Sequence, residues 1–192
     1  MSLWIGVLAS GAVGLGTGFT ISGWTAGSLW VVLGLAVVAA AAERGRVRVS
    51  NNIEESISLL PTLLVAVLFG PLPSMIVAAA SMMGQFGRPY MRWATYTCSR
   101  SVTGALTGLV AVEASHVASS LSRFAAIAIG TSAGALVAET LDVLFASFTL
   151  RLRRSGGALE ALATLAPLAL SAVPIYAPLV AMLAFAYEEV SS

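Results

Sequence analysis

The sequence has no lysine, one cysteine and one histidine, and charged residues make up only 10% of its 192 positions. A soluble domain typically carries about 25% charged residues to cover its surface. A single cysteine excludes an intrachain disulfide framework and a zinc site built from cysteines. The net charge of +1 provides no extended basic surface, so no nucleic-acid partner is expected. These shortages argue against a soluble enzyme and against a nucleic-acid-binding protein.

Apolar residues dominate what is present. They fill 58% of the chain, and the mean hydropathy is +0.91. No charged residue precedes Glu43, and an uncharged stretch of that length is typical of transmembrane helices. No basic region precedes the first apolar stretch, so we expect a retained helix rather than a cleaved signal peptide. The composition predicts an all-α, polytopic transmembrane bundle, with residues 1–192 forming one integral membrane domain in the lipid bilayer.

Seven hydrophobic segments predict a bundle of seven helices, within a range of six to eight. The segments cover residues 3–20, 27–42, 53–69, 74–86, 94–112, 124–150 and 159–187. The third and fourth are short, about 20 to 26 Å as helices, whereas a bilayer core needs about 30 Å. The corner Gly70-Pro71-Leu72-Pro73 joins these two, and both short spans and a re-entrant hairpin are open interpretations. The last segment contains three prolines, so one helix and two half-helices are both open.

The arginines predict the orientation, because cytoplasmic loops near helix ends collect basic residues. If every segment spans the membrane, three clusters fall on one side and only Arg123 falls on the other. The clusters are Arg44, Arg46 and Arg48, then Arg88, Arg92 and Arg100, then Arg151, Arg153 and Arg154. This bias places the amino terminus in the cytoplasm. With seven spans, the carboxy terminus and its Glu188 and Glu189 lie outside.

The ionisable residues inside the apolar segments are the first candidates for a functional site. Glu139 and Asp142 lie three residues apart and share a face of the sixth segment. Arg100 lies at a similar depth in the fifth segment. A charge within the bilayer is costly and usually faces the bundle or a cavity. Two interpretations stay open: these three residues line a polar ligand-binding cavity, or they form an ion pair that fixes two helices.

Glu113 and His116 form a second candidate, a pH-sensitive pair near the outer end of the fifth segment. A histidine beside a carboxylate could sense pH near neutrality, and a solvated helix end is the other interpretation of the pair. Two ligands are too few for a metal site, and no metal or cofactor is expected. Near the third segment, Asn51 and Glu54 have the spacing of a capping box. The single thiol, Cys98, is predicted to be a small buried apolar residue.

Small residues and aromatics predict packing and membrane depth. Three motifs with glycines four residues apart favour close helix approach. They are Gly14 with Gly18, Gly104 with Gly108, and Gly130 with Gly134. We expect Gly104 and Gly130 to bring the fifth and sixth segments together, close enough for Arg100 to meet an acidic residue. Tyr90, Trp93 and Tyr96 are interpreted as anchors at the membrane interface, with a ligand-stacking platform as the alternative.

No nucleophile elbow, Walker A motif, zinc-protease motif or paired-cysteine motif is present, so an enzyme is not expected. The stretch from Ile57 to Val110 carries the strings Leu68-Phe69-Gly70-Pro71-Leu72, Arg88-Pro89-Tyr90-Met91-Arg92-Trp93 and Tyr96-Thr97-Cys98-Ser99-Arg100. This stretch resembles the amino-terminal membrane sensor region found ahead of GGDEF, EAL or HD-type signalling domains in some bacteria. It is also similar to the substrate-binding S components of energy-coupling-factor transporters.

The first resemblance implies a non-enzymatic sensor or ligand-binding domain of a bacterial signalling protein, located in the inner membrane. No GGDEF, EAL or HD motif follows in this chain, so its output would pass to a partner membrane protein, to a second copy, or to an output domain that this chain lacks. The second resemblance implies the alternative function, the substrate-binding subunit of a small-molecule uptake transporter. Uptake implies a small-molecule ligand, and a sensor would respond to such a ligand or to the state of the membrane. A structural membrane subunit with no ligand is a third interpretation.

Overall fold

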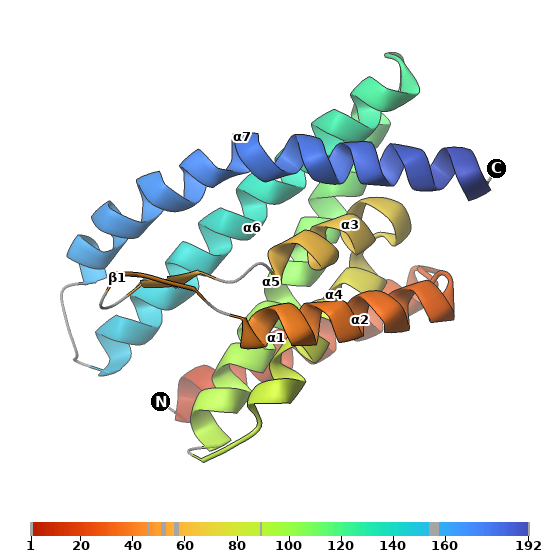
Figure 1. Cartoon of the computed structure of the whole chain (residues 1–192). Helices are drawn as coiled ribbons and strands as arrows, with labels where there is room; N and C mark the ends of the chain where they lie inside the picture. The colour runs from red at the N-terminus through yellow and green to blue at the C-terminus, as the bar shows by residue number, and fades with distance from the viewer. Residues whose placement is uncertain are drawn as a thin grey trace.

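The computed structural model describes residues 2–45, 47–50, 53–55, 58–88, 90–153 and 158–191. In these residues seven α-helices form one bundle (Figure 1), which confirms the predicted fold class. The helices are α1 (Ser2–Ile21), α2 (Leu29–Arg44), α3 (Leu59–Phe69), α4 (Pro71–Ser81), α5 (Tyr90–Val117), α6 (Arg123–Arg153) and α7 (Ala158–Ser191). A 3-10 helix, Met82–Gln85, follows α4, and a small hairpin of β1 (Val47–Ser50) and β2 (Ile53–Glu55) follows α2.

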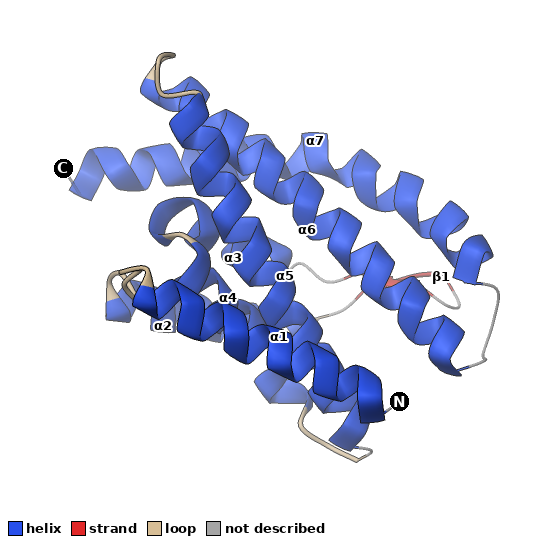
Figure 2. Cartoon of the chain, turned by 180° about the vertical axis from the view of Figure 1, so that it is seen from behind, coloured by secondary structure: helices blue, strands red, loops and turns tan. Residues whose placement is uncertain are grey.

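Helix α5 forms the centre of the bundle. It packs against α1, α3, α4 and α6, while α7 packs on α6 and α3, and α2 packs on α3 and α4. Seen from behind (Figure 2), α1 and α5 cross the molecule in front of the remaining helices. Among the described residues, three helices are long and apolar enough to cross a membrane, within the ranges Leu3–Ile21, Arg123–Thr149 and Leu165–Ser191. Length and composition therefore indicate a membrane protein.

The proline-rich last segment is one helix. Pro167, Pro174 and Pro178 all lie inside α7, which continues to Ser191. Arg123 at the start of α6 contacts Glu188 near the end of α7 at 2.8 Å. The end of α7 therefore lies beside the start of α6, and the two termini lie at opposite ends of the bundle (Figures 1 and 2). The sequence allowed either one helix or two half-helices here, and the structure has one helix.

The corner between α3 and α4 depends on one glycine. Gly70 has φ +83°, a left-handed conformation that glycine adopts without steric cost. A Cβ atom at this position would lie 2.5 Å from the ring of Trp24, so the loop between α1 and α2 covers the corner closely. Pro71 then occupies the first turn of α4, where its missing N–H leaves no partner unsatisfied. Helices α3 and α4, with 11 residues each, form the predicted pair of short helices.

The predicted start of the third segment is wrong. Residues 53–55 form strand β2, which pairs antiparallel with β1, and the helix begins only at Leu59. Glu54 therefore stands opposite Arg48 in a hairpin instead of in the first turn of a helix. The proposed capping partner Asn51 lies outside the described residues. The alternating sequence Val47-Arg48-Val49-Ser50 was the signal for a strand, since alternation is the pattern of a β-strand.

Candidate functional site: a polar core inside the bundle

The centre of the candidate site is an ion pair between α5 and α6. Arg100 Nη1 lies 2.6 Å from Asp142 Oδ2, and Thr103 Oγ1 donates a hydrogen bond of 3.3 Å to the second carboxylate oxygen. Arg100 and Thr103 are three residues apart, so both project from one face of α5. Asp142 is thereby held through both of its oxygens. The predicted contact between Arg100 and an acidic residue of the sixth segment is present.

This pair lies well inside both helices. Asp142 is 11 residues from the end of α6, about 16 Å along the axis, and Arg100 is about 15 Å from the start of α5. The side chains keep 21% and 27% of their surface exposed, so each is largely enclosed by neighbouring helices. Charges at such positions usually face the interior of a bundle, because lipid cannot solvate them. The pair occupies the half of the bundle where α2 and α6 end and α5 begins.

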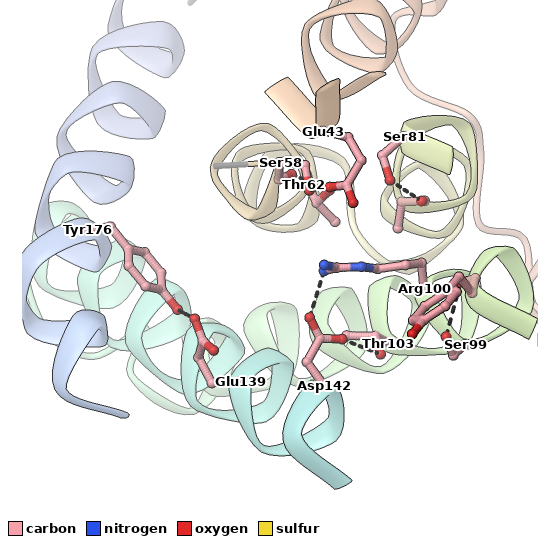
Figure 3. A network of polar contacts seen from close by, with 12 residues as sticks. Glu43, Ser58, Thr62, Ser81, Ser99, Arg100, Thr103, Glu139, Asp142 and Tyr176 are labelled. Carbon is pink, nitrogen blue, oxygen red and sulfur yellow. Dashed lines mark hydrogen bonds and ion pairs between the residues drawn. The ribbon is translucent and has the colours of Figure 1, made fainter. Parts of the chain in front are cut away.

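The second acidic residue of α6 contacts a different helix. Glu139 accepts a hydrogen bond of 2.8 Å from the hydroxyl of Tyr176 in α7. Figure 3 shows the two carboxylates diverging, with Asp142 directed at α5 and Glu139 directed at α7. The predicted trio is thus divided over two contacts. The sequence did not identify Tyr176 as the partner of Glu139. Tyr176 lies in an apolar stretch, and the alignment of that helix with α6 cannot be predicted from the sequence.

The most deeply buried charged group of the site was not predicted from the sequence. Glu43, in the last turn of α2, is only 1% exposed, and its Oε2 accepts a 2.6 Å hydrogen bond from Ser58. In Figure 3 the Glu43 carboxylate faces the guanidinium of Arg100 from the side opposite Asp142. Arg100 therefore stands between acidic side chains of α2 and α6. As the first charge after a long apolar run, Glu43 resembled an ordinary helix end in the sequence.

Hydroxyl groups surround these charges. Ser81 and Ser99 are buried and donate hydrogen bonds to carbonyls of their own helices, at 2.8 and 3.0 Å. Thr62 does the same in α3 at 3.0 Å, and Ser74 of α4 reaches the Thr62 carbonyl at 3.3 Å. Each hydroxyl uses its hydrogen in these bonds and keeps the lone pairs of its oxygen. The oxygens can therefore still accept hydrogen bonds from Arg100 or from a ligand. The core is consequently polar without being rich in unsatisfied groups.

The glycine motifs have partners that were only partly predicted. Gly130 and Gly134 of α6 do meet α5, near Ala111. Gly104 and Gly108 instead face α4, because a Cβ at Gly104 would lie 2.6 Å from the Ser74 carbonyl oxygen. The expectation that Gly104 brings α5 to α6 is therefore wrong. Gly14 and Gly18 have no neighbouring atom within 4 Å of a Cβ, so this motif makes no contact within the described chain.

The structure does not bring Glu113 and His116 together as a pair. Both side chains are exposed near the carboxy-terminal end of α5, and neither has a hydrogen bond or ion pair in the described part of the chain. His116 instead lines a cavity with Glu188. Cys98 is half-buried rather than fully enclosed. Among the described residues, no three His, Cys, Asp or Glu side chains form a group that could hold a metal ion.

The aromatic residues at the start of α5 pack within the protein. Trp93 Nε1 donates a 2.9 Å hydrogen bond to the Met82 carbonyl, and its ring meets Phe86 edge to face at 5.0 Å. The ring of Tyr90 also contacts Phe86, tilted by 35° with the ring centres 5.2 Å apart. This cluster closes the turn between the 3-10 helix and α5. A role as membrane anchors stays a prediction.

No family model, no curated protein and no solved structure matches the chain.

Proposed function

We propose that the chain is a non-enzymatic sensor in a bacterial inner membrane, in which the polar core is the element that switches between two helix packings. One observation carries this proposal. Arg100, inside the bundle, is held by Asp142 of α6 and faces Glu43 of α2. A cation between two acidic side chains from different helices can pair with either one, and in this proposal the core has one arrangement for each pairing.

The mechanism follows from how binding shifts such an equilibrium. A ligand or a change in the bilayer that packs better against one arrangement raises its population by its differential affinity. Helix shifts of about 1–2 Å are a common output of this kind of transition. Glu43 is at the end of α2, directly before the hairpin, and Asp142 is in the half of α6 that leads to its end. A change in the core would therefore reach the arginine-rich end of the bundle, where a partner would receive it.

The proposal includes a definite orientation, which cysteine labelling tests. In a Cys98→Ala background, a cysteine at Ser119, between α5 and α6, should react with a membrane-impermeant maleimide in intact cells. A cysteine at Gly45, directly after α2, should react only after the membrane is permeabilised. The physical reason is the arginine bias, which retains basic ends in the cytoplasm. The reverse labelling pattern would contradict the proposed orientation.

A distance measurement tests the switch itself. Spin labels at Gly45 and Leu152, both exposed, report the separation of the inner ends of α2 and α6 by pulsed electron spin resonance. The wild-type protein should show one dominant distance. Asp142→Asn should add a second population, because Arg100 loses its partner on α6 and keeps the acidic side chain of α2.

Glu113→Gln is the matched control for this measurement. It also removes one carboxylate, but at an exposed position of the opposite end of α5. Its distance distribution should equal that of the wild type. If Asp142→Asn likewise gives the wild-type distribution while remaining folded, the core is a fixed strut and the sensor mechanism fails.

Solute uptake is the second candidate, and the cavity at the other end of the bundle favours it. An uptake subunit must accept its substrate on the outer side, and the cavity opens where α1, α3, α5 and α7 end. Uptake requires a coupling partner that carries the substrate inward. Accumulation of a labelled substrate in cells that express the chain alongside such a partner would favour this function over sensing.

A further inference from the structure

A cavity of about 570 Å³ lies at the outer end of the bundle, away from the polar core. The loop between α1 and α2 forms one side, and the corner between α3 and α4 forms another. Ser115 and His116 of α5 and Glu188 of α7 complete the polar part of its lining. Small-molecule sites typically measure about 300–1,000 Å³ and combine an apolar wall with a few polar groups. This cavity has both the size and the mixed lining of such a site.

The apolar wall is aromatic and held in place. The ring of Trp24 lies against Gly70, and the ring of Phe69 lies against Gly27. Both glycines have positive φ angles, +83° and +66°, so the backbone is shaped to accept the two rings. Phe69 also meets Tyr187 edge to face at 6.0 Å. Trp24 and Phe69 therefore line the cavity from two separate segments of the chain, and each ring is packed against a neighbouring segment.

The electrostatics of this end favour a positive ligand. Its described charged groups are three carboxylates, Glu113, Glu188 and Glu189, and one guanidinium, Arg123. Arg123 contacts Glu188 at 2.8 Å and Glu189 at 3.4 Å, so a single cation is shared and two negative charges remain in excess. Phe69, His116 and Glu188 are each in the last turn of a helix, where the carbonyl end of the helix dipole is negative.

We infer that this cavity binds a small organic cation, an ammonium group carried by an apolar or aromatic body. The rings of Trp24 and Phe69 would contact the apolar body of the ligand, and the ammonium group would lie over a ring face, as quaternary ammonium ligands do with aromatic side chains. Glu188 would supply the opposing charge. That the cation is the signal of the sensor rests on the proposed function. Binding of the cation depends on the cavity alone.

Calorimetric titration of the detergent-solubilised protein with benzyltrimethylammonium chloride tests the inference. We expect saturable binding with one site per chain, and none with benzenesulfonate, which has a similar size and the opposite charge. Glu188→Gln should weaken binding at least about tenfold, because a carboxylate near a partly enclosed cation contributes more than 1.4 kcal/mol. Trp24→Leu should weaken it about three- to fivefold, the value of a cation–aromatic contact near the surface.

Two matched variants separate the cavity from general effects. Glu189→Gln removes the same charge from the neighbouring residue, which contacts Arg123 but does not line the cavity. Trp30→Leu removes a tryptophan that is 83% exposed on α2 and lies outside the cavity. Trp30→Leu should retain wild-type affinity within about twofold. Glu189→Gln should weaken binding less than Glu188→Gln does, because Glu189 contributes to the charge of this end but does not line the cavity. Each variant is compared only after its elution profile and melting temperature match those of the wild type.

The inference is overturned if benzyltrimethylammonium shows no saturable binding, if benzenesulfonate binds equally, or if the matched variants lose as much affinity as the cavity variants. The result is independent of the distance measurement on α2 and α6. Absence of binding with a second distance population in Asp142→Asn would refute the cation site and leave the proposed sensor intact. Binding with an unchanged distance distribution would support the site and refute the switch.

Discussion

Arg100→Ala should lower the free energy of unfolding by about 3 kcal/mol, because removing one member of a buried ion pair leaves the other charge uncompensated. Asp142 would keep only the 3.3 Å hydrogen bond from Thr103. Glu43 would lose the guanidinium that faces it in Figure 3. The measurement is the melting temperature and chemical denaturation of the detergent-solubilised protein. Adding Asp142→Asn should recover part of the loss, since a neutral amide is less costly to enclose than an unpaired carboxylate.

Arg92→Ala is the matched control for this prediction. Arg92 is exposed on the same helix, and its guanidinium lies 5.7 Å from the centre of the Tyr96 ring. A cation–aromatic contact at an exposed site contributes about 0.5–1 kcal/mol, so this variant should be much less destabilised. An equal loss in both variants would mean that α5 is sensitive to any arginine truncation and that the interior pair has no special weight.

Gly108→Ala should destabilise the protein by about 1–3 kcal/mol through overpacking. A Cβ atom at Gly108 would lie 2.6 Å from Pro71 Cα and 2.8 Å from the Gly70 carbonyl oxygen. Both are backbone atoms of the corner, so no side-chain movement relieves the contact and α5 must move away from α4. The change also shifts the wall of the outer cavity, because Phe69 and Gly70 belong to that corner.

Gly14→Ala is the same chemical change as Gly108→Ala, but it should not destabilise the protein. Nothing lies within 4 Å of a Cβ at Gly14, so the new methyl group meets no atom of the chain. Alanine is favoured over glycine in a helix by up to about 1 kcal/mol, and the variant should be as stable as the wild type or more so. A loss at Gly14 equal to that at Gly108 would contradict the packing described for α5 and α4.

Much of the fold was predictable because long apolar segments report helices directly. The seven helices, the short third and fourth helices and the corner at Gly70 follow from composition and from the glycine and proline residues. The pair of Arg100 with an acidic residue of α6 was also predictable, because an interior charge needs a partner at its own depth. These features depend on one segment at a time, or on depth along a helix, and both can be counted in a sequence.

The features that were missed depend on how helices are rotated about their axes. Depth alone assigned Glu139 to the same contact as Asp142, but its orientation on α6 directs it to Tyr176. Gly104 was matched to the wrong helix for the same reason. Glu43 was overlooked because a charged residue in a last turn is usually solvated, whereas the neighbouring helices bury this one. Rotation and burial are set by tertiary packing, and no single segment encodes them.

The most direct test of the central claim is the coupling energy between Arg100 and Asp142 in a double-mutant cycle. If the pair is the centre of the polar core, Arg100→Ala and Asp142→Asn should be non-additive by about 1–3 kcal/mol. The same cycle with Glu139→Gln should be additive within about 0.5 kcal/mol, because Glu139 contacts Tyr176 of α7. Additive effects of Arg100→Ala and Asp142→Asn would show that the two residues do not depend on each other, and would contradict the account of this core.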